Sequence, residues 1–258
     1  MRTAILLLIA ATATAQVPDG DQHWAMRAEG HQGGRAQAAH IDAAIAAYQR
    51  AVAQSPNDLE PRWKLMRAIR FKGAYVAATN EAKKPIYTMG KKAGEEALAV
   101  AARHQGPGVA EVYLWDSVLW GEWALAYGKL AAVREGAADR IRREATMAMK
   151  LDPKLEGGAA PRVLGRLHDQ TPRVPFMTGW ASSKEAVRFL NESLKIDPAN
   201  KITKVFLAEA MVSHDSDSKP AAIAILRDVV KAPNDPAYEV EEAAATADAQ
   251  ALLKKWGG

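Results

Sequence analysis

The sequence predicts an all-α protein built from repeated pairs of helices. Alanine, the residue with the best helix propensity, supplies 53 of the 258 residues. Amphipathic stretches recur along the chain, and turns with a proline, which stops a helix, follow them. A recurrence of this kind, with insertions in some of the units, is typical of a helical-repeat solenoid. The prolines lie 51, 46, 45 and 35 residues apart, at Pro56, Pro107, Pro153, Pro198 and Pro233.

The first 15 residues are expected to direct export. Arg2 precedes the apolar run 4–13, and Ala13-Thr14-Ala15 forms a small-residue cleavage site before Gln16. Such a run suits a signal peptide and is too short to span a bilayer. The alternative is a buried N-terminal helix. We predict a signal peptide over 1–15, a linker over 16–22, no transmembrane segment in the mature chain, and a periplasmic or secreted protein.

Composition excludes several classes of function. The chain has no cysteine, which excludes disulfides, thiolate metal sites, cysteine nucleophiles and a lipid attached to cysteine. The net charge of +4 is spread along the sequence instead of forming one basic patch, so we expect no nucleic-acid partner. Motifs of hydrolases, metal sites and phosphate-binding loops are not found in the sequence. We therefore expect no catalytic residues, no cofactor and no metal.

The repeats resemble the tetratricopeptide repeat (TPR), a pair of antiparallel helices in about 34 residues. The resemblance implies a TPR-like solenoid of about five helix pairs over 23–258, with insertions. It also implies that Gly165 and Ala186 lie where the two helices of one pair touch. The matching positions are Ala44, Tyr48, Ala51, Pro56, Leu65, Gly73, Leu164, Gly165, Ala186, Leu190, Pro198, Leu207 and Ala208.

The last segment, 236–258, is predicted to form a capping helix. A solenoid needs such an end, because its last repeat otherwise exposes its core face. The apolar stripe expected to cover that face consists of Val240, Ala244, Ala247, Ala251 and Leu252.

A narrower resemblance covers residues 40–256. The run 151–167 (LDPKLEGGAAPRVLGRL) and the segments 171–183 and 232–256 look like one bacterial exported TPR family. That family includes the TPR protein associated with TRAP-type (tripartite, ATP-independent) solute transporters, and it is similar to eukaryotic regulators of microtubule dynamics. The resemblance implies a partner such as the solute-binding protein of a transporter. The transporter-associated lipoproteins carry a lipid-bearing cysteine, which this chain lacks.

The segment 113–127 is predicted to be an aromatic helix. Trp120 shares one face with tyrosines seven residues away on either side, and Trp115 and Trp123 share another face. A helix that is apolar on several faces is buried on several sides. Two interpretations are open: a solid core helix, or the wall of an aromatic-lined cavity that holds a small hydrophobic ligand.

Two carboxylates, Asp116 and Glu122, interrupt this apolar segment. Ionised carboxylates are seldom buried without a partner. The expected partners are Arg162 and Arg166, which are four residues apart. The pairing is interpreted either as a structural ion pair between adjacent repeats or as a polar anchor for the head group of a ligand.

Three functions follow from these features. The first is a non-catalytic interaction scaffold that binds a protein or peptide partner in a concave groove. The second is a carrier or accessory subunit of a TRAP-type transporter that holds a small hydrophobic ligand. The third is an enzyme, which no residue pattern supports. We predict the scaffold, with the carrier as the alternative. The candidate binding residues are Trp63, Arg67, Arg70, Trp115, Asp116, Trp120, Glu122, Trp123, Arg162 and Arg166. The TPR alignment also places Glu60, Phe71 and Asp169 on the groove.

Overall fold

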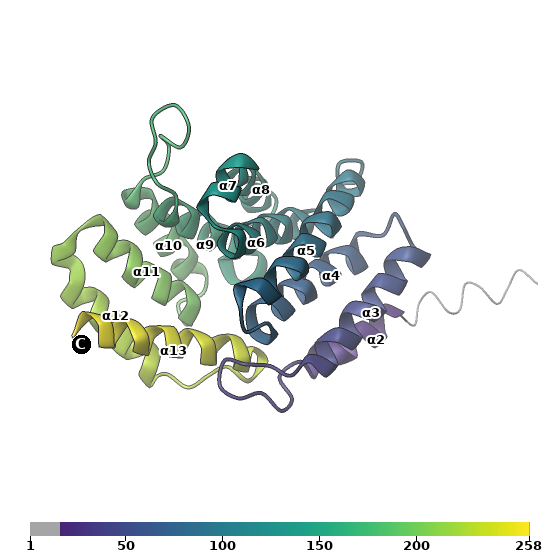
Figure 1. Ribbon diagram of the computed structural model, residues 1–258, viewed down its shortest axis with the longest axis horizontal. Coiled ribbons are helices and arrows are strands. Elements are labelled where there is room, and N and C mark those ends of the chain that lie inside the picture. The colour runs from purple at the N-terminus through teal and green to yellow at the C-terminus, as the bar shows by residue number, and fades with distance from the viewer. Residues whose placement is uncertain (1–15, 258) are drawn as a thin grey trace, which may run out of the picture.

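The protein is a succession of helices joined by turns. The computed structural model describes residues 16–257, which contain helices and no strand (Figure 1). The predicted signal peptide, 1–15, lies outside the described residues. The α-helices are α2 (Gln16–Ala25), α3 (Ala38–Gln54), α4 (Leu59–Phe71), α5 (Asn80–Ala101), α6 (Val109–Tyr127), α7 (Lys129–Arg134), α8 (Ala137–Leu151), α9 (Leu155–Gln170), α10 (Ser183–Ile196), α11 (Lys201–His214), α12 (Lys219–Lys231) and α13 (Glu239–Trp256). Shorter helical turns are η1 (Lys72–Val76), η2 (Ser216–Ser218) and η3 (Pro236–Tyr238).

The helices pack as successive pairs. Helix α2 packs on α3, α4 on α5, α6 on α8, α9 on α10, and α11 on α12, and α13 follows the fifth pair. The first helices of neighbouring pairs also touch, so that α4, α6, α9, α11 and α13 form an inner layer. The second helices form the outer layer (Figure 1). The predicted all-α helical-repeat solenoid of about five pairs is confirmed.

The expected linker, 16–22, is part of a helix instead. Helix α2 is the first member of the first pair and packs along α3. Gly20 lies so close to the Tyr48 ring that a Cβ at this position would overlap the ring. The Tyr48 hydroxyl donates to Asp21 Oδ1 at 2.7 Å. The sequence did not indicate this helix because its ten residues include Pro18 and Gly20 and few apolar side chains.

The tight crossing expected at Gly165 is present within the pair α9 and α10. A Cβ built on Gly165 would lie 2.6 Å from Leu190 Cγ and 3.1 Å from the carbonyl oxygen of Ala186. Both distances are shorter than a normal van der Waals contact. The absence of a side chain at Gly165 therefore sets how closely these two helices approach.

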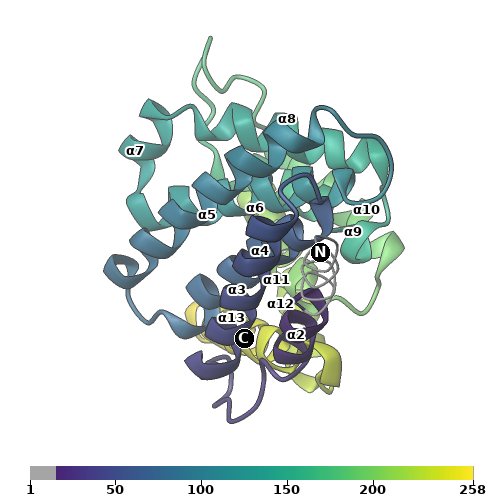
Figure 2. The same ribbon diagram turned by 90° about the vertical axis from the view of Figure 1, so that its right-hand side faces the viewer.

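Two insertions separate the helices of a pair. Helix α7 stands between α6 and α8, and the segment 171–182 stands between α9 and α10. Both insertions lie at the same end of the molecule, at the top of Figure 1 and of Figure 2. Trp180, near the end of the second insertion, donates to Asp139 Oδ1 of α8 at 3.1 Å. This hydrogen bond holds the base of the segment against the neighbouring repeat.

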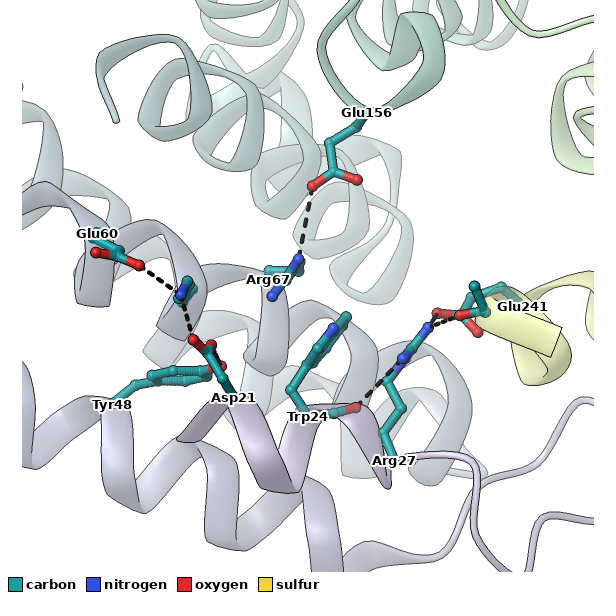
Figure 3. Close-up of polar contacts among 10 residues, drawn as sticks. Asp21, Trp24, Arg27, Tyr48, Glu60, Arg67, Glu156 and Glu241 are labelled. Carbon is teal, nitrogen blue, oxygen red and sulfur yellow. Dashed lines mark hydrogen bonds and ion pairs between the residues drawn. The ribbon is translucent and has the colours of Figure 1, made fainter. Parts of the chain in front are cut away.

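Helix α13 covers the end of the solenoid and also reaches its beginning. Ala245 and Ala249 are buried in one apolar cluster with Leu226 of α12, as a capping helix requires. The predicted stripe is wrong at Ala247 and Ala251, which are exposed, and correct at Val240, which is buried. On another side of α13, Glu241 accepts a hydrogen bond from Arg27, which follows α2. The first and last units of the solenoid therefore touch, and they close one side of the concave face (Figures 1 and 3).

Candidate functional site

A groove of about 1450 Å³ runs along the concave face. Its walls come from the inner helices α4, α6, α9 and α11, from the end of α2, and from the turn η3 with the start of α13. Both insertions contribute to its rim. Of the predicted binding residues, Arg67, Arg70, Trp115, Glu122, Arg162 and Arg166 line this groove.

Helix α4 supplies two arginines to the groove. Trp63, Arg67 and Arg70 share one face of α4 because they are spaced by four and three residues. The Arg67 guanidinium lies over two indole rings, with its Cζ 4.1 Å from the centre of Trp24 and 4.9 Å from that of Trp63. Its Nη1 is 3.8 Å from Glu156 Oε1 across the groove (Figure 3). Trp63 thus supports Arg67 from beneath.

Glu156 reaches Arg67 because of a break at the start of α9. Glu156, Gly157 and Gly158 have left-handed φ angles of 47°, 63° and 75°. Such angles are uncommon for a residue with a side chain, and here they direct the chain toward the groove before regular helix begins. The glycine-rich segment at the start of α9 therefore positions the Glu156 carboxylate in the groove.

Arg70 belongs to a hydrogen-bond network that is satisfied inside the protein. Its Nε donates to Glu122 Oε1 at 3.0 Å, and its Nη1 donates to the Tyr75 hydroxyl at 2.9 Å. The Tyr87 hydroxyl donates to Glu122 Oε2 at 3.2 Å. Glu122 therefore joins α6 to α4 and α5, and its partner is Arg70, not the predicted Arg162 or Arg166.

Arg166 is also neutralised within the chain. Its Nη1 lies 2.7 Å from Glu209 Oε2 and 3.3 Å from Asp169 Oδ2. Its Cζ lies 4.3 Å from the centre of the Phe206 ring. This residue therefore joins α9 to α11.

Arg162, one turn before Arg166 on α9, is different. Within residues 16–257 it forms no ion pair, and its hydrogen bond goes to a neutral group, Thr203 Oγ1, at 3.4 Å. Burial and the neighbouring positive charge of Arg70 lower the pKa of Arg162, against the attraction of Glu156 and Asp197. A guanidinium that faces a groove without a carboxylate partner is a ready binding point for an anionic group.

The predicted partners of Asp116 are wrong. Asp116 is fully buried and does not line the groove. It accepts from Arg140 of α8, whose Nε lies 3.1 Å from Oδ2 and whose Nη2 lies 3.3 Å from Oδ1. The pair holds α6 to α8, the two helices of one repeat, instead of joining adjacent repeats. Asp116 is therefore placed as a structural residue.

The aromatic helix divides its tryptophans between two faces. Trp120 and Trp123 are buried against α5, where Lys91 Nζ lies 3.8 and 3.9 Å from their ring centres. Trp123 stacks on Tyr127 with ring centres 4.6 Å apart. Trp115 faces the groove. The sequence predicted that Trp115 and Trp123 share one face and that Trp120 lies on another; in the structure Trp123 lies with Trp120 against α5, and Trp115 is separate from both.

Sequence reasoning missed the contribution of the two chain ends. Trp24 and Arg27 line the groove from a segment next to the expected linker, and Tyr238 and Glu241 line it from the capping helix and the turn before it. Arg27 Cζ lies 4.4 Å from the centre of the Trp24 ring. Trp24, which stands in a polar stretch of the sequence, could have indicated that this segment is packed, because a large apolar ring is seldom placed in a solvated linker.

Two further features bear on the class of protein. Over the described range, no helix has the length and apolar character needed to cross a membrane. The same residues contain no group of three or more acidic or histidine side chains arranged to hold a metal ion.

Comparison with known proteins supports the fold. No protein-family model matches the sequence, and no curated protein matches it. Among solved structures, a thermophilic TPR protein of Thermus thermophilus is similar to this chain, with a TM-score of 0.58 and 16% sequence identity. The match covers 91% of this chain and 99% of that chain. At this identity the likeness shows the fold alone: the chain has the helical-repeat fold of a TPR protein.

Proposed function

We propose that the protein is a non-catalytic scaffold whose groove binds an extended segment of a protein partner. The observation that carries the proposal is Arg162, a guanidinium that faces the groove and has no carboxylate partner within the described chain. The other groove arginines, Arg27, Arg67, Arg70 and Arg166, are already paired. We infer that the partner supplies an acidic group at Arg162.

The size of the groove favours a peptide over a small molecule. Its volume of about 1450 Å³ exceeds the roughly 300–1,000 Å³ of sites for drug-sized ligands. Indole and phenyl rings line it at intervals, at Trp24, Trp115 and Phe206. Aromatic rings and arginines are the residues that contribute most to protein interfaces.

Binding of acidic peptides tests this function. Short random peptides are selected on the purified protein, and the affinity of each selected peptide is compared with that of its Asp→Asn or Glu→Gln analogue. The acidic form should bind more tightly. Arg162→Ala should lower the affinity by roughly 10- to 100-fold, the range for a charge-assisted hydrogen bond. The same variant should fold as well as the original protein or better, because it removes an unpaired charge from a poorly hydrated site.

The matched control is Arg188→Ala. Arg188 lies on the outer helix α10, where it pairs with Glu185 and Glu192 and its side chain is 47% exposed. This variant should bind every selected peptide normally. Equal affinity of the acidic and amide peptides for the original protein, or no selection of peptides at all, would contradict the proposal.

A carrier function for a TRAP-type transporter is the second candidate. It is supported by the sequence resemblance over 40–256 and by the apolar face that α6 presents to the groove at Val118 and Leu125. In this function a small hydrophobic ligand lies on that face and is exchanged with a solute-binding protein. Native mass spectrometry of the protein purified from its host tests the carrier function. A carrier should retain a bound small molecule, whereas a scaffold should retain a bound polypeptide.

We propose that the protein acts after export, with Met1–Ala15 removed. Helix α2 begins at Gln16, so cleavage after Ala15 leaves the first helix pair whole. The intact mass of protein recovered from the periplasm or the medium tests this location. A chain that retains its first 15 residues in the cytoplasm would contradict it.

A further inference from the structure

Exposed apolar side chains gather at the end of α6 and on the two insertions. Within the described chain, seven of the ten large hydrophobic residues that are exposed lie in the ranges 125–133 and 174–177. Leu125, Leu130, Val133 and Met177 are more than half exposed, and Phe176 is fully exposed. We call these two ranges the apolar edge. Scattered exposed hydrophobic residues are ordinary, but their collection at the end of α6 and on two insertions at the same end of the molecule is not.

The backbone presents these side chains instead of burying them. Phe176 has a left-handed φ of 64°, which is uncommon for a residue with a bulky side chain. It stands in a segment that projects beyond the helix pairs (Figures 1 and 2). Leu130 and Val133, three residues apart, lie on one side of the short helix α7. The same end of the molecule therefore offers apolar side chains from two separate segments.

The charged residues within the two segments that form the apolar edge are all basic. The ranges 125–134 and 171–182 contain Lys129, Arg134 and Arg173 and no aspartate or glutamate. The acids that follow α7 form ion pairs, Glu135 with a lysine of α5 and Asp139 with an arginine of its own helix, and Asp139 also accepts the hydrogen bond from Trp180. Projecting apolar side chains with basic residues beside them match the interface of a bilayer that contains anionic lipid.

We propose that the apolar edge binds the surface of an anionic lipid bilayer. The apolar side chains of Leu130, Val133, Phe176 and Met177 enter the headgroup region, and Lys129, Arg134 and Arg173 lie against the lipid phosphates. Five residues of the apolar edge, Leu125, Val133, Val174, Phe176 and Met177, also line the groove, whereas Leu130 lies outside it. Because the edge also forms part of the groove rim, the test below measures peptide binding as well as vesicle binding on the edge variants.

Co-sedimentation with lipid vesicles tests the proposal on the purified protein. Vesicles of phosphatidylglycerol and phosphatidylcholine should bind the protein at low salt, and binding should weaken at high salt or on pure phosphatidylcholine. The double variants Phe176→Ser/Met177→Ser and Leu130→Ser/Val133→Ser should each lower the partition coefficient by roughly tenfold or more, since each removes two apolar side chains from the lipid. Lys129→Gln/Arg173→Gln should reduce the salt dependence.

The control is Met147→Ser/Leu151→Ser, which removes two exposed apolar side chains from α8, outside the apolar edge. It should bind vesicles as the original protein does. The proposal is overturned if the original protein does not sediment with the anionic vesicles at low salt, or if the control loses as much binding as the edge variants. It is also overturned if the edge variants keep vesicle binding and lose only peptide binding, or if they lose only self-association in sedimentation velocity.

Discussion

Arg27 and Glu241, 214 positions apart in the sequence, form a buried ion pair that joins the two ends of the solenoid. Arg27 Nη2 lies 2.9 Å from Glu241 Oε1, and its Nε lies 3.1 Å from the same oxygen. In most solenoids each repeat contacts its neighbours alone, so stability is close to a sum of local terms. Here a contact between the first unit and the capping helix adds a long-range term and closes one side of the groove.

Removal of Arg27 should therefore be costly. Arg27→Ala leaves the Glu241 carboxylate buried without its partner, and breaking a buried pair in this way costs about 3–5 kcal/mol. We expect a loss of this size in the free energy of unfolding measured with urea. Small-angle X-ray scattering should show a larger radius of gyration, because the first pair and α13 are no longer held together.

The double variant Arg27→Met/Glu241→Leu distinguishes the contribution of the ion pair to stability from the contribution of side-chain packing. It removes both charges and keeps apolar volume, so much of the stability should return. Arg188→Ala, which breaks exposed ion pairs on α10, should cost no more than about 1 kcal/mol. An Arg27→Ala protein as stable as the Arg188→Ala protein would show that the ends of the solenoid fold independently.

The buried Asp116 predicts a specific pH dependence. Burial raises the pKa of its carboxyl to about 6 from the ordinary value of 3.8, although the hydrogen bonds from Arg140 act in the opposite direction. Between these two values the folded state holds the proton more tightly than the unfolded chain does. The contribution of this group to stability therefore falls as the pH rises through this window, by about 3 kcal/mol, and is constant above it.

Asp116→Asn should lack this dependence, because asparagine does not titrate. Relative to the variant, the original protein should lose about 2 kcal/mol of unfolding free energy between about pH 4 and about pH 7. Urea unfolding of both proteins at the two pH values measures the difference. Asp139→Asn on α8, a 58% exposed carboxylate, is the control and should follow the original protein. Parallel pH profiles for Asp116→Asn and the original protein would rule out a raised pKa at Asp116.

Glycine-to-alanine substitutions at Gly165 and at Gly121 should have opposite effects on stability, because only Gly165 lies at a close crossing of two helices. Gly165→Ala places a Cβ 2.6 Å from Leu190 Cγ, so the helices must separate at a cost of roughly 1–3 kcal/mol. Gly121→Ala in α6 meets no atom within 4 Å and should stabilise by about 1 kcal/mol through helix propensity. Thermal unfolding should show a lower melting temperature for the first variant and a higher one for the second. Two shifts of the same sign would contradict the crossing.

The repeat signature predicted the fold because it records where helices must approach closely, as at Gly165. It did not predict the pairing of Asp116 with Arg140. Helix α6 is apolar on all sides, so its sequence has no periodicity to show which face meets the groove and which meets α8. The contact of Arg27 with Glu241 has no local signal, because it depends on the summed curvature of five pairs. The unpaired state of Arg162 likewise depends on where the acids of other helices lie.

The two faces of α6 give the last prediction. Trp123 is 6% exposed and packs between Trp120 and Tyr127 on the side away from the groove. Trp123→Ala should cost about 3–5 kcal/mol, the usual loss for a packed core aromatic, and the molecules that remain folded should bind groove peptides normally. Trp115 lies on the groove side, so Trp115→Ala should cost less stability and lower peptide affinity by roughly tenfold. Urea unfolding and peptide binding on both variants measure the contrast. A stable Trp123→Ala protein that no longer binds the peptides would place the binding site among Trp120, Trp123 and Tyr127. That outcome would support the aromatic-lined cavity as the functional site.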